Sequence, residues 1–269
     1  MSTVTSTPPA QSMTSASARP VSLLRGVRLE FRKARRKHLW LISFALLVVE
    51  LAWLTYQETR SELPVTDYRE LLFQLPILNA IFLPLLATVV ASTICDIEFR
   101  ANMLKELLVM EKPGTLYAAK WLACMLVLAV VVIVQTAALV AIGSYFGYGS
   151  FPAGDLALYA ISTFAVCLLI ATVIQVLSFF ASSQFIPLAV GVALAFFGLF
   201  SMYLPVVVAQ FVPSSYYALL STVGMVYDEA TRTSTFFSID WSLAHFLVIV
   251  VLTAVVYMLS ARAFSRKEL

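Results

Sequence analysis

The stretch IEFRANMLKELLVMEKPGTLYAAKW, residues Ile97–Trp121, is a charged, water-compatible segment between two of the most apolar runs of the chain. With Asp96 counted in, it carries four basic and four acidic side chains. The whole chain is 61% hydrophobic and 12% charged, whereas soluble domains are roughly 45–50% apolar and about 25% charged. A lipid bilayer must therefore supply most of its solvent, and the sequence predicts an all-α polytopic membrane protein.

The apolar runs predict six transmembrane helices. Their lengths of ~18–28 residues suit helices, because a barrel strand needs only ~9–11 residues. Pro76, Pro84, Pro187 and Pro205 are expected to kink or interrupt the spans that contain them. The fifth run is too long for one untilted crossing, so we expect it to break near Pro205 with its tail at the outer surface. The predicted spans are Leu39–Tyr56, Leu71–Cys95, Ala118–Ile142, Leu156–Phe180, Phe185–Val212 and Leu243–Ala261.

The lysines and arginines indicate how the chain is oriented. With the N-terminus in the cytoplasm, all but three of the 18 fall on the inner side, and only Arg60, Arg69 and Arg232 lie outside. This asymmetry follows the positive-inside rule and predicts that both termini are cytoplasmic. The basic residues would face anionic inner lipid, so nucleic-acid binding is not indicated. On the outer side, the aromatic-rich segment Pro213–Trp241 is expected to form interfacial helices that cap the exit path.

The N-terminal arm has two parts. Residues 1–20 are rich in Ser, Thr, Ala and Pro, and predict a disordered tail and not a signal peptide. Residues 21–38 predict an amphipathic helix in the cytoplasmic interface, with an apolar stripe among acyl chains and cations among headgroups. The alternative is a plain basic flank that stops the first span. The stripe consists of Leu23, Leu24, Val27, Phe31 and Ala34.

The opening stretch predicts a short amphipathic helix at the cytoplasmic rim, between spans two and three. Its apolar residues fall roughly along one side, its charges lie elsewhere, and the Lys112–Gly114 turn ends it. One interpretation is a loop that folds merely to cover its own leucines. The other is a docking element, which its length and charge balance favour, because a connecting loop needs only a few residues.

The order E-x-x-x-x-M-L-K-E-L-L…P-G-x-L-Y-A-A-K-W, from Glu98 to Trp121, follows a basic amphipathic arm. In this position it resembles the permease subunits of ATP-binding-cassette exporters of the second type (ABC-2). It is most similar to the bacterial subgroup that protects against lantibiotics and bacitracin-like peptides. The similarity covers nearly the whole chain in span number and order, although the motif is a loose pattern of residue classes. Residues 39–269 would then form one six-span permease domain in the bacterial plasma membrane.

The resemblance implies a division of labour among subunits. Two permease subunits, identical or paralogous, would sit on a pair of ABC ATPase subunits that bind ATP and Mg²⁺, and this chain would hold no cofactor. In agreement, the sequence has no GxxxxGK[ST] motif. The opening stretch would be the coupling helix, with its apolar side in a groove of the ATPase and its charges at the rim. The implied coupling residues are Arg100, Met103, Leu104, Lys105, Glu106, Leu107, Leu108, Met110 and Glu111.

Glu50 lies about eleven residues into the first span, which is ~16 Å along a helix and near the middle of a ~30 Å hydrocarbon layer. Since no Lys or Arg lies at this depth in the spans to pair with it, we expect a protonated carboxyl. It would bond to a neighbour such as Asn79 or Gln135, or face a wet cavity. These three residues are the candidate substrate pathway for a cationic or amphipathic substrate. Alternatively, the first span slides inward and leaves Glu50 near the outer rim.

Other function classes are less well supported. An enzyme is not indicated, because the sequence has no HExxH, no GxSxG and no paired intramembrane aspartates. An ion- or proton-coupled secondary transporter using Glu50 is the main alternative, although the span count is small and no inverted repeat is evident. A purely structural or docking membrane subunit would have a similar sequence. Cys95, Cys124 and Cys167 lack a CxxC pair and predict buried apolar positions, not a disulfide or a metal site.

Overall fold

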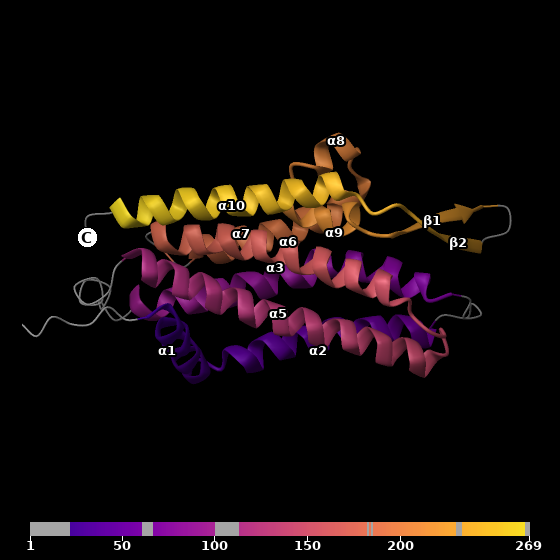
Figure 1. Cartoon of the computed structure of the whole chain (residues 1–269). Helices are drawn as coiled ribbons and strands as arrows, with labels where there is room; N and C mark the ends of the chain where they lie inside the picture. The colour runs from indigo at the N-terminus through magenta and orange to yellow at the C-terminus, as the bar shows by residue number, and fades with distance from the viewer. Residues whose placement is uncertain are drawn as a thin grey trace, which may run out of the picture.

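The computed structural model describes residues 22–60, 67–99, 113–181, 183, 185–229 and 233–266, and for residues 96–99 and 202 the backbone alone. Long helices run side by side and form an elongated bundle (Figure 1). One end carries α1 and the end of α10, and the other carries a β-hairpin; we call them the α1 end and the hairpin end. The elements are α1 (Leu23–Arg36), α2 (Leu39–Arg60), α3 (Arg69–Phe99), α5 (Pro113–Phe146), α6 (Ala153–Phe180), α7 (Phe185–Phe200), η1 (Ser201–Tyr203), α8 (Val206–Ala209), η2 (Pro213–Ser215), α9 (Tyr216–Leu219), β1 (Val223–Asp228), β2 (Thr233–Ser238) and α10 (Leu243–Arg266).

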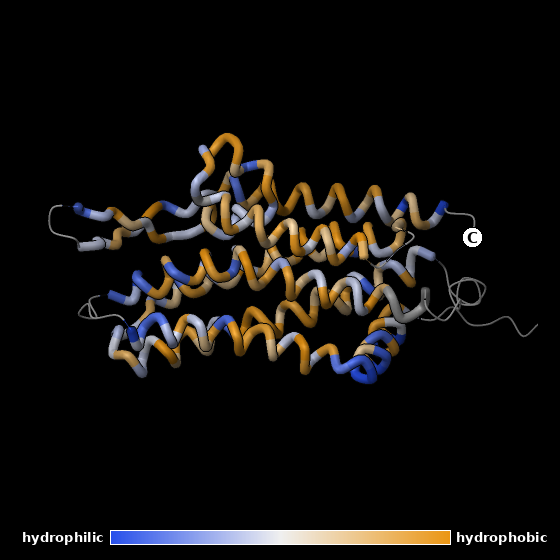
Figure 2. Tube along the Cα trace, turned by 180° about the vertical axis from the view of Figure 1, so that it is seen from behind, coloured by the Kyte–Doolittle hydropathy of each residue, from blue (hydrophilic) through white to orange (hydrophobic). Residues whose placement is uncertain are grey.

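Among the described residues, five helices are long and apolar enough to cross a membrane, namely α2, α3, α5, α6 and α10. Each overlaps a predicted span, which agrees with the all-α polytopic fold predicted from hydropathy. Figure 2 shows apolar residues along most of the length of these helices and hydrophilic residues towards their ends. In α3 and in α6, 61% of the most apolar stretch is buried, against 17% in α10. The first two therefore form the centre of the bundle, and α10 lies at its periphery.

The fifth predicted span, Phe185–Val212, does not form one helix. α7 has 16 residues and ends at Phe200, so it is ~24 Å long and shorter than a ~30 Å hydrocarbon layer. A 3₁₀ turn follows, and Leu204 is extended with φ −88° and ψ 146°, the conformation favoured before a proline. Pro205 then caps the short helix α8. The break expected near Pro205 occurs, and the six-span prediction is corrected to five candidate spans and one shorter apolar helix.

α3 and α7 pack closely where a proline leaves a carbonyl group free. α3 stays helical through both of its prolines, and because Pro84 has no N–H, the carbonyl of Ala80 lacks its usual partner. A Cβ added to Gly198 of α7 would lie 2.5 Å from this oxygen, and one added to Gly191 would lie 2.1 Å from Thr88 Oγ1. These two glycines let the backbones approach, as small residues do at contacts between membrane helices.

The segment Pro213–Trp241 contains a β-hairpin where we predicted interfacial helices. Only its first part, η2 and α9, is helical, and β1 pairs with β2 in an antiparallel hairpin. The prediction is wrong for this part because VGMVYD and TSTFFS are rich in β-branched and aromatic residues, which favour strands. The hairpin projects beyond the helix ends (Figure 1). Phe236 of β2 anchors it to α3 by packing on Phe73, with ring centroids 5.7 Å apart.

α1 lies across the end of the bundle, at a steep angle to the long helices (Figure 1). It packs mainly on α5 and also touches α2 and α3. The buried side differs from the predicted apolar stripe, since Leu24 is 83% exposed while Glu30 is buried. That the stripe inserts among acyl chains therefore stays a prediction, and the structure adds a protein-facing side of α1 that includes the acidic residue Glu30. The buried residues are Gly26, Val27, Glu30 and Ala34. The predicted tail, residues 1–20, lies outside the described residues.

Candidate functional site

Glu50, Asn79 and Gln135, the three residues predicted for the substrate pathway, meet inside the bundle. Gln135 Nε2 donates hydrogen bonds to Glu50 Oε1 at 2.9 Å and to Asn79 Oδ1 at 2.8 Å. All three side chains are fully buried. The structure thus joins α2, α3 and α5 through polar atoms in a part of the bundle that is otherwise apolar.

Tyr159 of α6 completes this group and was not predicted. Asn79 Nδ2 donates to Tyr159 Oη at 3.0 Å, and Tyr159 Oη donates to Gln135 Oε1 at 3.1 Å. Gln135, Asn79 and Tyr159 therefore form a closed ring of hydrogen bonds to which Glu50 is attached. Hydrogen bonds in a low-dielectric ring polarise and strengthen one another. We call these four residues the Glu50 cluster; it ties together four helices, α2, α3, α5 and α6.

The Glu50 cluster holds a carboxyl group where charge is costly. Glu50 is the twelfth residue of the 22-residue helix α2, so it lies ~15 Å from either end. Within the part of the chain that the structure describes, its Oε2 has no hydrogen-bond partner. An unpaired buried carboxylate costs several kcal/mol, which favours the neutral acid at this depth. The second oxygen then offers one unused polar position to a substrate or a water molecule.

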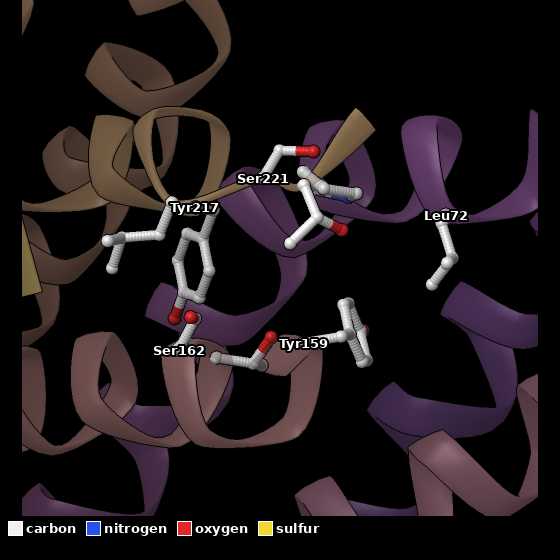
Figure 3. A pocket seen from close by; sticks show the side chains of 9 residues that line it. Leu72, Tyr159, Ser162, Tyr217 and Ser221 are labelled. Atoms are coloured by element: carbon white, nitrogen blue, oxygen red, sulfur yellow. The ribbon is translucent and has the colours of Figure 1, made fainter. Parts of the chain in front are cut away.

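A small pocket reaches the Glu50 cluster from the hairpin end. It is lined by Tyr159 and Ser162 of α6, by Leu72 of α3 and by Tyr217 of α9 among others, and Figure 3 shows Tyr217 pointing towards Ser162. Its cavity volume is about 10 Å³, enough for about one water molecule. Ligand pockets commonly measure about 300–1,000 Å³. In this conformation the pocket is too small for a peptide or a drug, which could enter it only if the helices moved apart.

The implied coupling residues, from Arg100 to Glu111, lie outside the described residues, but both flanking helices are described. α3 ends at Phe99 and α5 begins at Pro113, and both ends lie at the α1 end of the bundle (Figure 1). Whatever moves the segment between them acts directly on α3 and α5. These helices carry Asn79 and Gln135 of the Glu50 cluster.

Lys120 of α5 links this helix to α1 and to α3. Its Nζ lies 3.0 Å from Glu30 Oε2 of α1 and donates to the carbonyl of Ile94 in α3 at 2.9 Å. Lys120 is fully buried and Glu30 is 2% exposed, while Glu30 Oε1 also pairs with Lys33 at 2.9 Å. From the sequence, Lys120 was expected only as one of the positive charges on the inner side, and no role was predicted for Glu30. The sequence did contain a sign that Glu30 has a partner, since it is the only acidic residue between positions 21 and 38.

At the hairpin end, Tyr148 joins two acidic residues. Its hydroxyl group donates to Glu58 of α2 and lies 3.2 Å from Glu70 Oε2 of α3. Burial, reinforced by these carboxyl groups, raises the pKa of Tyr148 far above its ordinary value, so that the hydroxyl stays protonated. Glu58 is only 6% exposed, and it therefore depends on this donor.

Tyr148→Phe is expected to lower the free energy of unfolding by about 1–3 kcal/mol, because Glu58 would stay buried without its donor. Thermal unfolding of the purified protein in detergent micelles measures the change. Tyr145→Phe is the matched control, since Tyr145 is 83% exposed and should tolerate the change. Equal unfolding midpoints for the two variants would contradict the role given to Tyr148.

Neither a metal centre nor a disulfide is seen in the described part of the chain. No group of three or more His, Cys, Asp or Glu residues there could hold a metal ion. Cys95, Cys124 and Cys167 are free and buried.

The chain is similar to one known protein family. A family model described as ABC-2 family transporter protein matches residues 27–198, which is more than half of the chain and runs from α1 into α7. No curated protein matches the chain. The matched region includes every residue of the Glu50 cluster, the Glu30–Lys120 pair and the predicted coupling segment.

Proposed function

Because the chain belongs to the ABC-2 family of transporter proteins, we propose that it is the transmembrane permease subunit of an ATP-binding-cassette exporter. It would move substrate out of the cell with energy from ATP hydrolysed by a separate ATPase subunit. The family and the five long apolar helices make the chain a multi-pass membrane protein. ATP and Mg²⁺ would bind to a pair of ATPase subunits, and a second permease subunit would complete the transporter.

The observation that carries this proposal is the Glu50 cluster. It places a carboxyl group and three amide or hydroxyl side chains where α2, α3, α5 and α6 meet. Polar and ionisable residues inside membrane spans are costly and commonly mark a transport pathway. Separation of these four helices would expose the cluster to a substrate, and their closure would remove it again.

Coupling to the ATPase is proposed through residues 100–111, with both termini in the cytoplasm. The distribution of Lys and Arg along the sequence supports this orientation, and the basic helix α1 shares one end of the bundle with the last turn of α10 (Figure 1). A push on the segment would reach the Glu50 cluster through α3 and α5. Lys120 supports this route, because it links the two helices near the segment.

The proposed substrate class is a cationic or amphipathic peptide antibiotic of the lantibiotic or bacitracin type, so that export confers resistance. A cationic group near the unused oxygen of Glu50 would favour loss of the proton, and the resulting carboxylate would pair with that group. The resemblance of the Glu98–Trp121 motif to peptide-protection permeases points the same way. An ion- or proton-coupled secondary transporter is not favoured, because the family match is to a transporter class driven by a partner ATPase.

Glu50→Gln tests this function. The variant keeps the size of the side chain and removes the acid, so we expect export to fall about tenfold, as a loss of about 1.4 kcal/mol would produce. The measurement is the inhibitory concentration of a lantibiotic for cells that express the permease with its ATPase. The amount of permease in the membrane should not change.

Thr136→Val is the matched control for this test. Thr136 is the next residue along α5, and its hydroxyl bonds only to the carbonyl of Val132 in the same helix. It should leave resistance unchanged. Full resistance in the Glu50→Gln variant would remove Glu50 from the transport pathway and leave it a structural role.

A further inference from the structure

α1 presents a basic face away from the protein. At ~100° per residue, Arg25, Arg28 and Arg32 fall within ~60° of one another around the helix. Glu30 and Ala34, which are buried against the bundle, fall on the opposite side. The three guanidinium groups therefore share one exposed face.

The rotation of α1 about its own axis is fixed. Glu30 is paired with Lys120 at 3.0 Å and with Lys33 at 2.9 Å, and both Glu30 and Lys120 are out of contact with solvent. Turning the helix would separate a buried ion pair, which is strongly unfavourable. The arginine face is thus held outwards as a permanent surface of the protein.

The same face is hollowed. Arg25, Arg28, Leu29 and Arg32 surround an open, shallow hollow of about 370 Å³ between their side chains. Apolar side chains lie in and beside this hollow, since Leu29, which lines it, is 43% exposed and Leu24 is 83% exposed. A ligand that fits must combine an anionic group for the arginines with an apolar part for the two leucines.

The position of α1 agrees with a ligand in the membrane surface. The helix lies across the ends of the spans, where the chain changes from apolar to hydrophilic (Figures 1 and 2). Helices in this position lie at the depth of lipid headgroups, and arginine binds phosphate oxygens in bidentate fashion. We propose that the hollow formed by Arg25, Arg28, Leu29 and Arg32 binds the phosphate group of an anionic phospholipid, with Leu24 and Leu29 against its acyl chains.

Free phosphate shares the anionic chemistry but not the apolar part. An acidic protein segment could pair with the arginines, but Leu24 would then remain exposed beside it. Lipid is the occupant that satisfies both halves of the site. The site is independent of the proposed transport function, because it uses neither the Glu50 cluster nor residues 100–111.

The test uses the full-length protein, purified in detergent and freed of lipid, with thermal unfolding as the readout. It is titrated with an anionic phosphatidylglycerol, with phosphatidylcholine of the same acyl chains, and with inorganic phosphate. We expect only the phosphatidylglycerol to raise the unfolding midpoint. The triple variant Arg25→Gln/Arg28→Gln/Arg32→Gln should bind it about a hundredfold more weakly, at about fivefold per arginine.

Arg262→Gln/Arg266→Gln is the matched control, because both arginines are exposed near the same end of the bundle in α10. It should keep the response of the wild type. If the triple variant does not fold, Arg28→Gln alone should still weaken binding about fivefold.

Four outcomes would overturn the lipid site. Three of them are unchanged binding of phosphatidylglycerol by the arginine variants, an equal response to phosphatidylcholine, and an equal response to inorganic phosphate. The last would mean a site for a simple anion. A wild type without any lipid response, in which the arginine changes instead remove a bound acidic protein, would assign the face to a protein partner and would also overturn the proposal.

Discussion

Lys120→Met is expected to lower the free energy of unfolding of the protein by about 3 kcal/mol or more. Methionine is close to lysine in size but carries no charge. The reason for the loss is that Glu30 is 2% exposed and would lose its buried partner while keeping its pair with the partly exposed Lys33, and the Ile94 carbonyl would lose a donor. Removing one member of a buried ion pair leaves an uncompensated charge. Thermal and denaturant unfolding of the purified protein would measure the loss.

The double variant Glu30→Met/Lys120→Met distinguishes this cause from a general packing defect. Replacing a whole buried pair with apolar residues of similar volume is often nearly neutral, so the double variant should recover most of the lost stability. Lys37→Met, at an exposed position just after α1, should change little. If the double variant is as unstable as Lys120→Met, the ion pair is not the reason for the loss.

Leu107→Asp is expected to abolish co-purification of the ATPase with the permease. Leu107 stands in the middle of the apolar side predicted for the coupling segment, and a carboxylate there would be placed in a desolvated groove. Central apolar anchors at interfaces contribute about 2–4 kcal/mol each, so the complex should weaken by about thirtyfold or more. A pull-down through a tag on the permease, quantified against the permease in the membrane, measures it.

Glu111→Gln is the matched control for this prediction, because it changes a charge on the rim of the same segment. Rim charges contribute little to affinity, and the ATPase should still co-purify. Equal pull-down yields for Leu107→Asp and the wild type would exclude this segment as the coupling helix.

Much of the bundle could be predicted from composition alone. Runs such as Leu156–Phe180 contain too few charges to remain in water, and α6 begins only three residues before that predicted span, at Ala153. Helix boundaries were harder, because an apolar run continues where the helix stops. α7 ends at Phe200 although the apolar character persists to Val212, and the backbone preference before Pro205 outweighs hydropathy there.

The hairpin could have been predicted, and the reason it was missed is physical. Aromatic residues at a membrane surface suit interfacial helices and strands equally, so Tyr227 and Phe236 did not decide between them. The β-branched neighbours did contain the signal, since Thr233 and Thr235 alternate on β2. Contact of Phe236 with Phe73 of α3 holds the hairpin against the bundle.

The candidate site was predicted in part. Glu50, Asn79 and Gln135 were recognisable one by one, because each is a polar residue in an apolar span and must find a partner. Their common meeting point depends on how four helices pack, which a single sequence does not encode locally. Tyr159 was missed because tyrosine is common in spans and its hydroxyl needs a partner only when buried.

The Glu30–Lys120 pair was missed for a related reason. Lysines near the ends of spans normally reach the headgroup region, and Lys120 was counted among them. Here the first turns of α5 lie under α1, so the side chain meets Glu30 and not lipid. The ninety positions that separate these two residues in the sequence gave no hint of the contact.

We propose that the segment between α3 and α5 faces the cytoplasm and is pushed by a partner ATPase. The most direct test is Lys105→Cys in a background in which Cys95, Cys124 and Cys167 are replaced by serine, labelled with a membrane-impermeant maleimide. Thr235→Cys in the exposed part of the hairpin serves as the reference for the outer side. We expect Lys105→Cys to be labelled in inside-out vesicles and to be protected in intact cells. Thr235→Cys should be labelled in intact cells. Labelling of Lys105→Cys in intact cells would contradict the proposal.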